Sequence, residues 1–194
     1  APWRTAVLAR LWARAALAGL RWFCGIRLVV LGWEHLPPRG PMLIAAEHQS
    51  AFDTIVWHIL VSAPAYVVKR ELMRLPLFGP LLRHGGQIGL DRAAGAAALR
   101  GLVRDTERAV AEGRPVVIFP QGTRTLPGER VPLQPGIAAQ AARTHLPVIP
   151  VATDSGRCWG RRAFRKRPGT IRIIVGPPIP PGLARAALLA RIEA

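Results

Sequence analysis

Short runs of apolar residues recur along this chain, and each is followed by a segment with a helical pattern. Residues 41–46, 115–119 and 146–151 are the clearest of these runs, and they are too short for helices. Apolar runs without polar alternation are typical of strands that are buried on both faces of a parallel sheet. The sequence therefore predicts an α/β domain with a largely parallel β-sheet flanked by helices.

The remaining elements follow from the same patterns and from the positions of Gly and Pro. Further strands are expected at residues 26–33, 65–68 and 171–175, and a short strand that runs into a helix at 86–92. Helices are expected at residues 51–62, 93–112, 136–144 and 181–194. Residues 76–80 begin and end with proline and are expected to form a rigid apolar turn.

His48 and Asp53 lie between the first apolar run and the helix expected at 51–62. Side chains that meet on one helix face are three or four residues apart, so a spacing of five does not suit a helix face. It does suit a histidine in the turn between strand and helix, with an aspartate in the first helical turn reaching back. An aspartate that binds one ring nitrogen fixes the histidine tautomer and leaves the other nitrogen free to act as a base.

A purely structural role for the same residues is also open. Ser50 and Asp53 precede an apolar run with the spacing of a capping box, in which both side chains bind N–H groups at the start of a helix. In that case Asp53 is a helix cap, and His48 is an ordinary turn residue.

The net charge of +16 on 194 residues predicts an anionic partner. Nucleic acid, anionic lipid and a phosphorylated substrate all meet that requirement. Half of the residues are apolar, which excludes a disordered chain. Cys24 and Cys158 form neither a disulfide framework nor a metal-ligand cluster, which fits a reducing compartment.

Residues 4–23 are expected to form a basic amphipathic helix. Its arginines gather on one side and its large apolar residues on the other: Arg10, Arg14 and Arg21 against Leu8, Trp12 and Phe23. Such a helix either lies in the headgroup region of a membrane or packs its apolar face on the domain. No segment reaches the roughly 20 apolar residues of a transmembrane helix. The chain begins with Ala rather than Met, which leaves open an anchor in residues before Ala1.

Cationic side chains follow two of the expected strands. They are Lys69 and Arg124. Open α/β sheets bind ligands outside the carboxyl ends of their strands, so these side chains are candidates for binding an anion there. Gly122 allows a close approach of the backbone to a ligand, and the guanidinium of Arg124 offers a planar fork that suits phosphate.

His48-x4-Asp53, followed by Phe119-Pro-Gln-Gly-Thr-Arg124, resembles the motifs of the glycerolipid acyltransferases, specifically the 1-acylglycerol-3-phosphate acyltransferases. The resemblance extends from residue 26 to about 176, with further similar blocks at residues 32–37, 69–72, 76–79, 86–92 and 146–151. A single His-x4-Asp pattern is weak, but four motifs in the expected order are specific.

The resemblance implies transfer of an acyl group from a thioester, acyl-CoA or acyl carrier protein, to the 2-hydroxyl of a lysophosphatidate, which gives phosphatidic acid. It implies no metal and no bound cofactor. Residues 1–25 are then expected to be a membrane-associating helix, and residues 26–194 the acyltransferase domain.

The family motifs also imply roles for single residues. His48 matches the general base that takes the hydroxyl proton, and Asp53 matches the residue that orients its ring. The cations that match phosphate ligands are Lys69, Arg92 and Arg124. The residues expected to position the substrate are Gln121, Gly122 and Thr123.

Two positions depart from the family pattern. Gln121 stands where the third motif commonly carries Glu, so it cannot act as a base, although its amide can bind the glycerol backbone or hold a loop. Glu47 precedes the histidine where Asn is common. Its carboxylate either raises the pKa of His48 or points away, and the sequence does not decide between the two.

The expected partners are a lysophospholipid acceptor, the acyl donor and an anionic membrane surface. The expected location is the cytoplasmic face of a bacterial inner membrane, either peripheral or anchored. Alternatives are a different acceptor such as lyso-ornithine lipid, a basic lipid- or nucleic-acid-binding module without catalysis, and an inactive relative. Nucleic acid is not expected, because the chain has no reader motif and only one Tyr and five Phe for base stacking.

Overall fold

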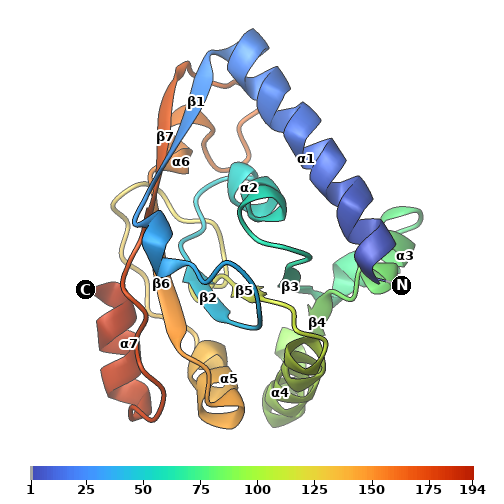
Figure 1. The fold of residues 1–194 in the computed structure, drawn as a ribbon, viewed down its shortest axis with the longest axis vertical. Coiled ribbons are helices and arrows are strands. Elements are labelled where there is room, and N and C mark those ends of the chain that lie inside the picture. Colours follow the sequence, from blue (N-terminus) through green and yellow to red (C-terminus); the bar gives the residue numbers. More distant parts are fainter. Residues whose placement is uncertain (1) are drawn as a thin grey trace.

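The computed structural model describes residues 2–194, apart from the side chains of Pro2, Trp3 and Arg92. Within these residues a seven-stranded sheet has the order β1-β7-β6-β2-β5-β3-β4 (Figure 1). Its strands are β1 (Ile26–Leu31), β2 (Leu43–Ala46), β3 (Ala65–Lys69), β4 (Ile88–Leu90), β5 (Val116–Ile118), β6 (Val148–Thr153) and β7 (Gly169–Val175). The helices are α1 (Pro2–Cys24), α2 (Phe52–Leu60), α3 (Phe78–His84), α4 (Gly95–Ala111), α5 (Gly136–Thr144), α6 (Ser155–Cys158) and α7 (Arg185–Glu193).

Neighbouring strands run parallel everywhere in this sheet except between β6 and β7. The predicted α/β class with a largely parallel sheet is therefore confirmed. In β7 and in its edge neighbour β1, buried residues alternate with more exposed ones. By contrast, every residue of β2 and β5 is buried, as a central parallel strand requires.

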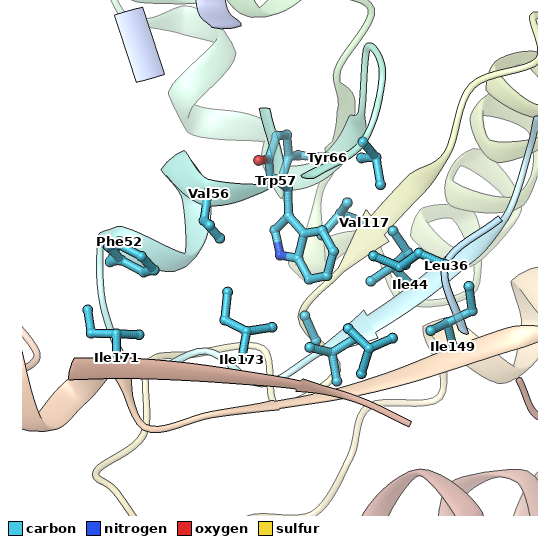
Figure 2. Packing of buried hydrophobic residues seen from close by; sticks show 14 of the residues in the cluster. Leu36, Ile44, Phe52, Val56, Trp57, Tyr66, Val117, Ile149, Ile171 and Ile173 are labelled. Atoms are coloured by element: carbon cyan, nitrogen blue, oxygen red, sulfur yellow. The ribbon is translucent and has the colours of Figure 1, made fainter. Parts of the chain in front are cut away.

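Helices cover both faces of the sheet (Figure 1). Successive side chains of a strand point to opposite faces. In β2, Ile44 and Ala46 therefore pack with α2, whereas Leu43 and Ala45 pack with α4 and α5. Figure 2 shows the indole of Trp57 directed from α2 toward the sheet, where it is fully buried. This packing fixes α2, and with it the segment that precedes α2, against the sheet.

The N-terminal helix α1 packs on α2 and also keeps a large exposed surface. Its buried side is narrow and is formed by Ala13 and Leu20. The residues predicted to form its apolar side, Leu8, Trp12 and Phe23, are all exposed, at 66%, 56% and 92%. The helix therefore packs on the domain through Ala13 and Leu20 rather than through the apolar side predicted from the sequence. Its association with a membrane stays a prediction. No helix in the described residues is long and apolar enough to cross a membrane.

The prediction of a turn at residues 76–80 is wrong in part, because α3 begins at Phe78. The turn is confined to the residues before it, where Leu77 has a positive φ of 63°. Pro80 lies in the first turn of α3, a position at which its missing N–H is tolerated. The helix expected from residue 93 likewise begins later, at Gly95, after a 3₁₀ turn at Arg92–Ala94.

Arg114, which directly precedes β5, is buried and organises the backbone around it. Its guanidinium donates to the carbonyl oxygens of Ala63, Pro64, Gly85 and Gly86 at 2.7–3.3 Å and contacts Glu112 at 3.2 Å. One side chain thereby joins the turn before β3 to the turn before β4. Five N–H groups of a fixed planar fork are well suited to several carbonyls at once.

Substitution of Arg114→Met is expected to lower the free energy of unfolding by about 3 kcal/mol or more, because several buried carbonyls lose their partner. Urea unfolding measures this loss. Arg104→Met, on the exposed side of α4, is the matched control and should change stability by less than about 0.5 kcal/mol. A loss below about 1 kcal/mol for Arg114→Met contradicts this role.

Candidate active site

The carboxyl ends of β2 and β5 lie side by side, because these two strands are parallel neighbours. His48 follows β2 by two residues, and Phe119 directly follows β5. The loop 120–135 leaves the same edge of the sheet. The structure thus gathers the segments that the sequence singled out, at the edge where open α/β sheets bind their ligands.

The imidazole of His48 contacts the carboxylate of Asp53, with 3.2 Å between Nδ1 and Oδ2. An ionised carboxylate only accepts hydrogen bonds, so Nδ1 carries the proton and donates it. In the neutral ring, the other nitrogen, Nε2, then has a free lone pair. The side chain of Asp53 is 3% exposed and that of His48 is 13% exposed.

Asp53 also binds the backbone at the start of α2. Its Oδ2 accepts the N–H groups of Gln49 and Ser50, each at 2.7 Å. The hydroxyl of Ser50 accepts the N–H of Phe52 at 3.1 Å. Ser50 and Asp53 thus each accept backbone N–H groups at the start of α2, although Ser50 binds Phe52 rather than Asp53 as a full capping box requires, and the positive end of the helix stabilises the buried anion. The two roles considered from the sequence, helix cap and partner of the histidine, are therefore held by one carboxylate.

Aromatic rings form the wall behind His48. Phe119 stacks on the imidazole, with 4.2 Å between ring centroids, and Tyr66 of β3 stacks on Phe119 at 6.4 Å. Tyr66 is buried, and burial together with the charge of Asp53 raises the pKa of its hydroxyl well above the usual value. Burial lowers the pKa of His58, which packs on Tyr66, to about 4. His58 is therefore neutral at pH 7.

The stacking of Phe119 on His48 was missed from the sequence. The sequence places Phe119 at the end of an apolar run and at the start of the third family motif, and neither assignment predicts the stack. The period of the strand does predict the side to which Phe119 points. Residues two apart on a strand share a face, and Val117 packs on the α2 side of the sheet, which is also the side of His48. The missing information was that β5 is the neighbour of β2.

The backbone of His48 is fastened to the loop 120–135. The N–H of His48 donates to the side-chain oxygen of Gln121 at 2.7 Å. Thr125, which the sequence analysis did not select, donates its N–H to the carbonyl of His48 at 2.8 Å. Gln121 therefore holds the histidine loop, one of the two roles left open for its amide. A glutamate oxygen accepts the same N–H, so the replacement of Glu by Gln keeps this contact.

Glu47 is bound to β6. Its carboxylate accepts the N–H of Thr153 at 3.0 Å, and its own N–H donates to the carbonyl of Val151 at 2.8 Å. Of the two possibilities stated for Glu47, the structure supports the one in which its carboxylate serves a contact away from the imidazole.

The expected cations lie at the same edge of the sheet as far as the structure describes them. Lys69 is exposed at the carboxyl end of β3, the other neighbour of β5. Arg124 is half-buried and directly precedes Thr125, the residue that binds His48. Arg92 begins the turn after β4, and its side chain lies outside the described part of the structure.

Gly122 and Thr123 complete the predicted group in the loop 120–135. Gly122 has a φ of 72°, which a glycine adopts at little cost, and its N–H closes a tight turn on the carbonyl of Phe119 at 2.9 Å. Thr123 is exposed. Among the described residues, no group of His, Cys, Asp and Glu is arranged to hold a metal ion.

Comparison with known proteins identifies the family to which this chain belongs. A family model described as "Acyltransferase" matches residues 27–154. This range includes His48 and Asp53, the motif Phe119–Arg124, and the strands β1 to β6 apart from Ile26, the first residue of β1. The chain belongs to the acyltransferase family. The resemblance drawn from its motifs is therefore confirmed.

Curated relatives carry a more specific name. A 1-acyl-sn-glycerol-3-phosphate acyltransferase of Pseudomonas aeruginosa is 35% identical over 166 residues, which cover 86% of this chain and 64% of the relative. A 1-acyl-sn-glycerol-3-phosphate acyltransferase alpha of Homo sapiens is 27% identical over 171 residues, covering 86% of this chain and 60% of the relative. The chain thus spans less than two thirds of the length of these acyltransferases.

A solved structure shares the fold. The crystal structure of a 1-acyl-sn-glycerophosphate acyltransferase from Thermotoga maritima matches with a TM-score of 0.79 at 24% sequence identity. The match covers 97% of this chain and 75% of the other. The arrangement of sheet and helices described above is therefore one that an acyltransferase-family protein adopts.

Proposed function

We propose that this protein transfers an acyl group from a thioester, acyl-CoA or acyl carrier protein, to the 2-hydroxyl of 1-acyl-glycerol-3-phosphate, giving phosphatidic acid. The observation that carries the proposal is the contact of His48 Nδ1 with Asp53, which leaves Nε2 available at the ligand-binding edge of the sheet. The names of the relatives supply the acceptor. No metal or bound cofactor takes part.

An alcohol attacks a thioester well only if a base removes its proton as the new bond forms. Nε2 of His48 takes this proton while the acceptor oxygen bonds to the carbonyl carbon. The tetrahedral intermediate then breaks its carbon–sulfur bond, and the imidazolium returns the proton to the departing sulfur. Asp53 keeps the ring in the correct tautomer and stabilises the transient imidazolium. The stack of Phe119 on the ring limits its rotation.

The phosphate of the acceptor is held by Arg124 and Lys69, with Arg92 as the third expected ligand. Arg124 directly precedes Thr125, whose N–H donates to the carbonyl of His48. Anchoring the phosphate there places the glycerol hydroxyl near the imidazole. Orientation of this kind supplies several kcal/mol of the barrier, up to roughly 7–11 kcal/mol in well-oriented reactions.

The protein acts at a membrane surface in this proposal. Its net charge of +16 favours anionic lipid, and the exposed Leu8 and Trp12 of α1 suit the headgroup region. The proposed location is the cytoplasmic face of a bacterial inner membrane, with α1 as the associating segment of residues 1–25 and residues 26–194 as the catalytic domain. Nucleic acid is not a proposed partner.

The acceptor is tested with a panel of lysolipids and one radiolabelled acyl thioester. Lysophosphatidate is expected to be acylated far faster than lysophosphatidylcholine or lyso-ornithine lipid, because it exposes a phosphate monoester to the cations. Faster acylation of lyso-ornithine lipid contradicts the proposed acceptor and keeps the acyltransferase activity.

His48→Ala is expected to reduce kcat/KM at least about a hundredfold, because the variant has no base for the hydroxyl proton. Asp53→Asn should also reduce it strongly, since the amide no longer stabilises an imidazolium. The control is His84→Ala, which removes an exposed imidazole on α3 and should leave the rate unchanged. Circular dichroism checks the fold of each variant. Turnover of His48→Ala above about a hundredth of the unsubstituted rate contradicts the base role.

Arg124→Ala is expected to raise KM for lysophosphatidate by about tenfold or more, with a smaller effect on kcat, because a charged hydrogen bond to phosphate is lost. Arg130→Ala removes an exposed arginine from the same loop and serves as the control. Initial rates at varied acceptor concentration separate the two constants. An unchanged KM in Arg124→Ala refutes the assignment of the phosphate site.

A further inference from the structure

The loop 159–167 lies at the same end of the molecule as His48. It follows α6, which comes directly after the carboxyl end of β6, the parallel neighbour of β2. The N–H of Gly156 in α6 donates to the side chain of Gln49 at 3.2 Å, which ties α6 to the residue after His48. In Figure 1 the orange connection from α6 to β7 lies beside the carboxyl end of α1.

Aromatic side chains are unusually exposed at this end. Phe164 of the loop is 94% exposed, and Trp22 and Phe23 at the end of α1 are 78% and 92% exposed. Phe23 and Phe164 line one pocket of about 560 Å³ together with Arg165 and Lys166. Aromatic residues gathered on a surface and rimmed by polar groups mark a site of interaction. We call Phe23 and loop 159–167 the aromatic–basic patch.

The loop presents Phe164 through a defined set of contacts. The indole N–H of Trp159 donates to the carbonyl of Ala163 at 3.0 Å, and the N–H of Arg167 donates to the carbonyl of Cys158 at 2.8 Å. The ammonium of Lys166 lies 4.5 Å from the ring centre of Trp159 and 4.9 Å from that of Phe164. These contacts hold the loop 159–167 in a conformation in which the ring of Phe164 is exposed.

The charge of the patch has one sign. The loop carries Arg161, Arg162, Arg165, Lys166 and Arg167. Neither residues 155–192 nor residues 1–33, which supply the two sides of the patch, contain any Asp or Glu. Arginine and lysine next to exposed aromatic rings are suited to an anionic membrane surface, where the cations meet phosphates and the rings enter the interface.

We propose that the aromatic–basic patch docks on an anionic phospholipid surface and holds the edge of the sheet that carries His48 toward the membrane. Phe164 enters the interface, and the cations of the loop bind lipid phosphates. Phe23 lies on the same side of α1 as the exposed residues Leu8 and Trp12, so the patch continues the apolar side of that helix. The idea that this orientation helps a lysophospholipid reach His48 rests on the proposed acyl transfer. The contact of the patch with lipid does not depend on that reaction.

Insertion is tested with the full chain carrying Phe164→Cys, labelled with a nitrobenzoxadiazole fluorophore in a Cys24→Ser background. Vesicles of phosphatidylcholine with phosphatidylglycerol are expected to shift the emission to the blue, and high salt should reverse the shift. Leu183→Cys, an exposed position after β7, is the matched control and should not shift. An unshifted label at position 164 on vesicles that bind the protein, or equal shifts at both positions, overturns the proposal.

The charges are tested with the double variant Arg161→Glu/Arg165→Glu against Arg185→Glu/Arg191→Glu on α7, which makes the same change of net charge at exposed positions. The loop variant is expected to raise the vesicle Kd about tenfold or more, and the α7 variant by clearly less. Equal effects mean that only net charge matters and overturn the docking site. A loop variant that loses affinity for single-stranded DNA or for acyl carrier protein but keeps its vesicle affinity also overturns it.

Activity assays separate this proposal from the proposed function. The loop variant should lower the ratio of acyl transfer to an acceptor in vesicles over transfer to a soluble short-chain lysophosphatidate. An unchanged ratio overturns the orienting role of the patch. If the unsubstituted protein acylates no acceptor, the proposed function fails, and the fluorescence shift still decides whether the patch binds lipid.

Discussion

One oxygen of Asp53 accepts hydrogen bonds from Gln49, Ser50 and the ring of His48, and the candidate active site depends on this convergence. The two backbone donors fix the carboxylate at the start of α2, where the helix dipole favours a negative charge. The third contact then sets the position of the imidazole. Because Asp53 is buried, loss of these hydrogen bonds leaves either a carboxylate or two N–H groups without partners, which lowers the free energy of unfolding. The same physical need that caps the helix therefore also orients the base.

Sheet topology supplies the rest of the site. The parallel neighbours β2, β5 and β3 bring their carboxyl ends to one edge, so His48, Phe119 and Tyr66 can stack although they are far apart in the sequence. The loop 120–135 is joined to His48 by two hydrogen bonds. The side chain of Gln121 accepts the N–H of His48, and the N–H of Thr125 donates to the carbonyl of His48. A cation in that loop is thus positioned relative to the base by hydrogen bonds rather than by a flexible chain.

The parts of the structure that depend on local pattern could be predicted from the sequence. The strands at 41–46 and 115–119 and the pairing of His48 with Asp53 follow from apolar runs, capping residues and spacing. The contacts of Phe119, Tyr66 and Thr125 could not be predicted, because they depend on strand order, which local pattern does not contain. The helix α3 was missed because Pro76 and Pro80 together indicate a turn, although Pro80 is tolerated in the first turn of the helix.

The central claim, that Asp53 fixes the tautomer of His48, is tested most directly by the ¹⁵N chemical shifts of the labelled imidazole. At a pH where the ring is neutral, we expect the proton on Nδ1 and an unprotonated Nε2, and a mixture of tautomers in Asp53→Asn. A proton found on Nε2 in the unsubstituted protein contradicts the account, because that nitrogen then has no lone pair with which to accept the hydroxyl proton.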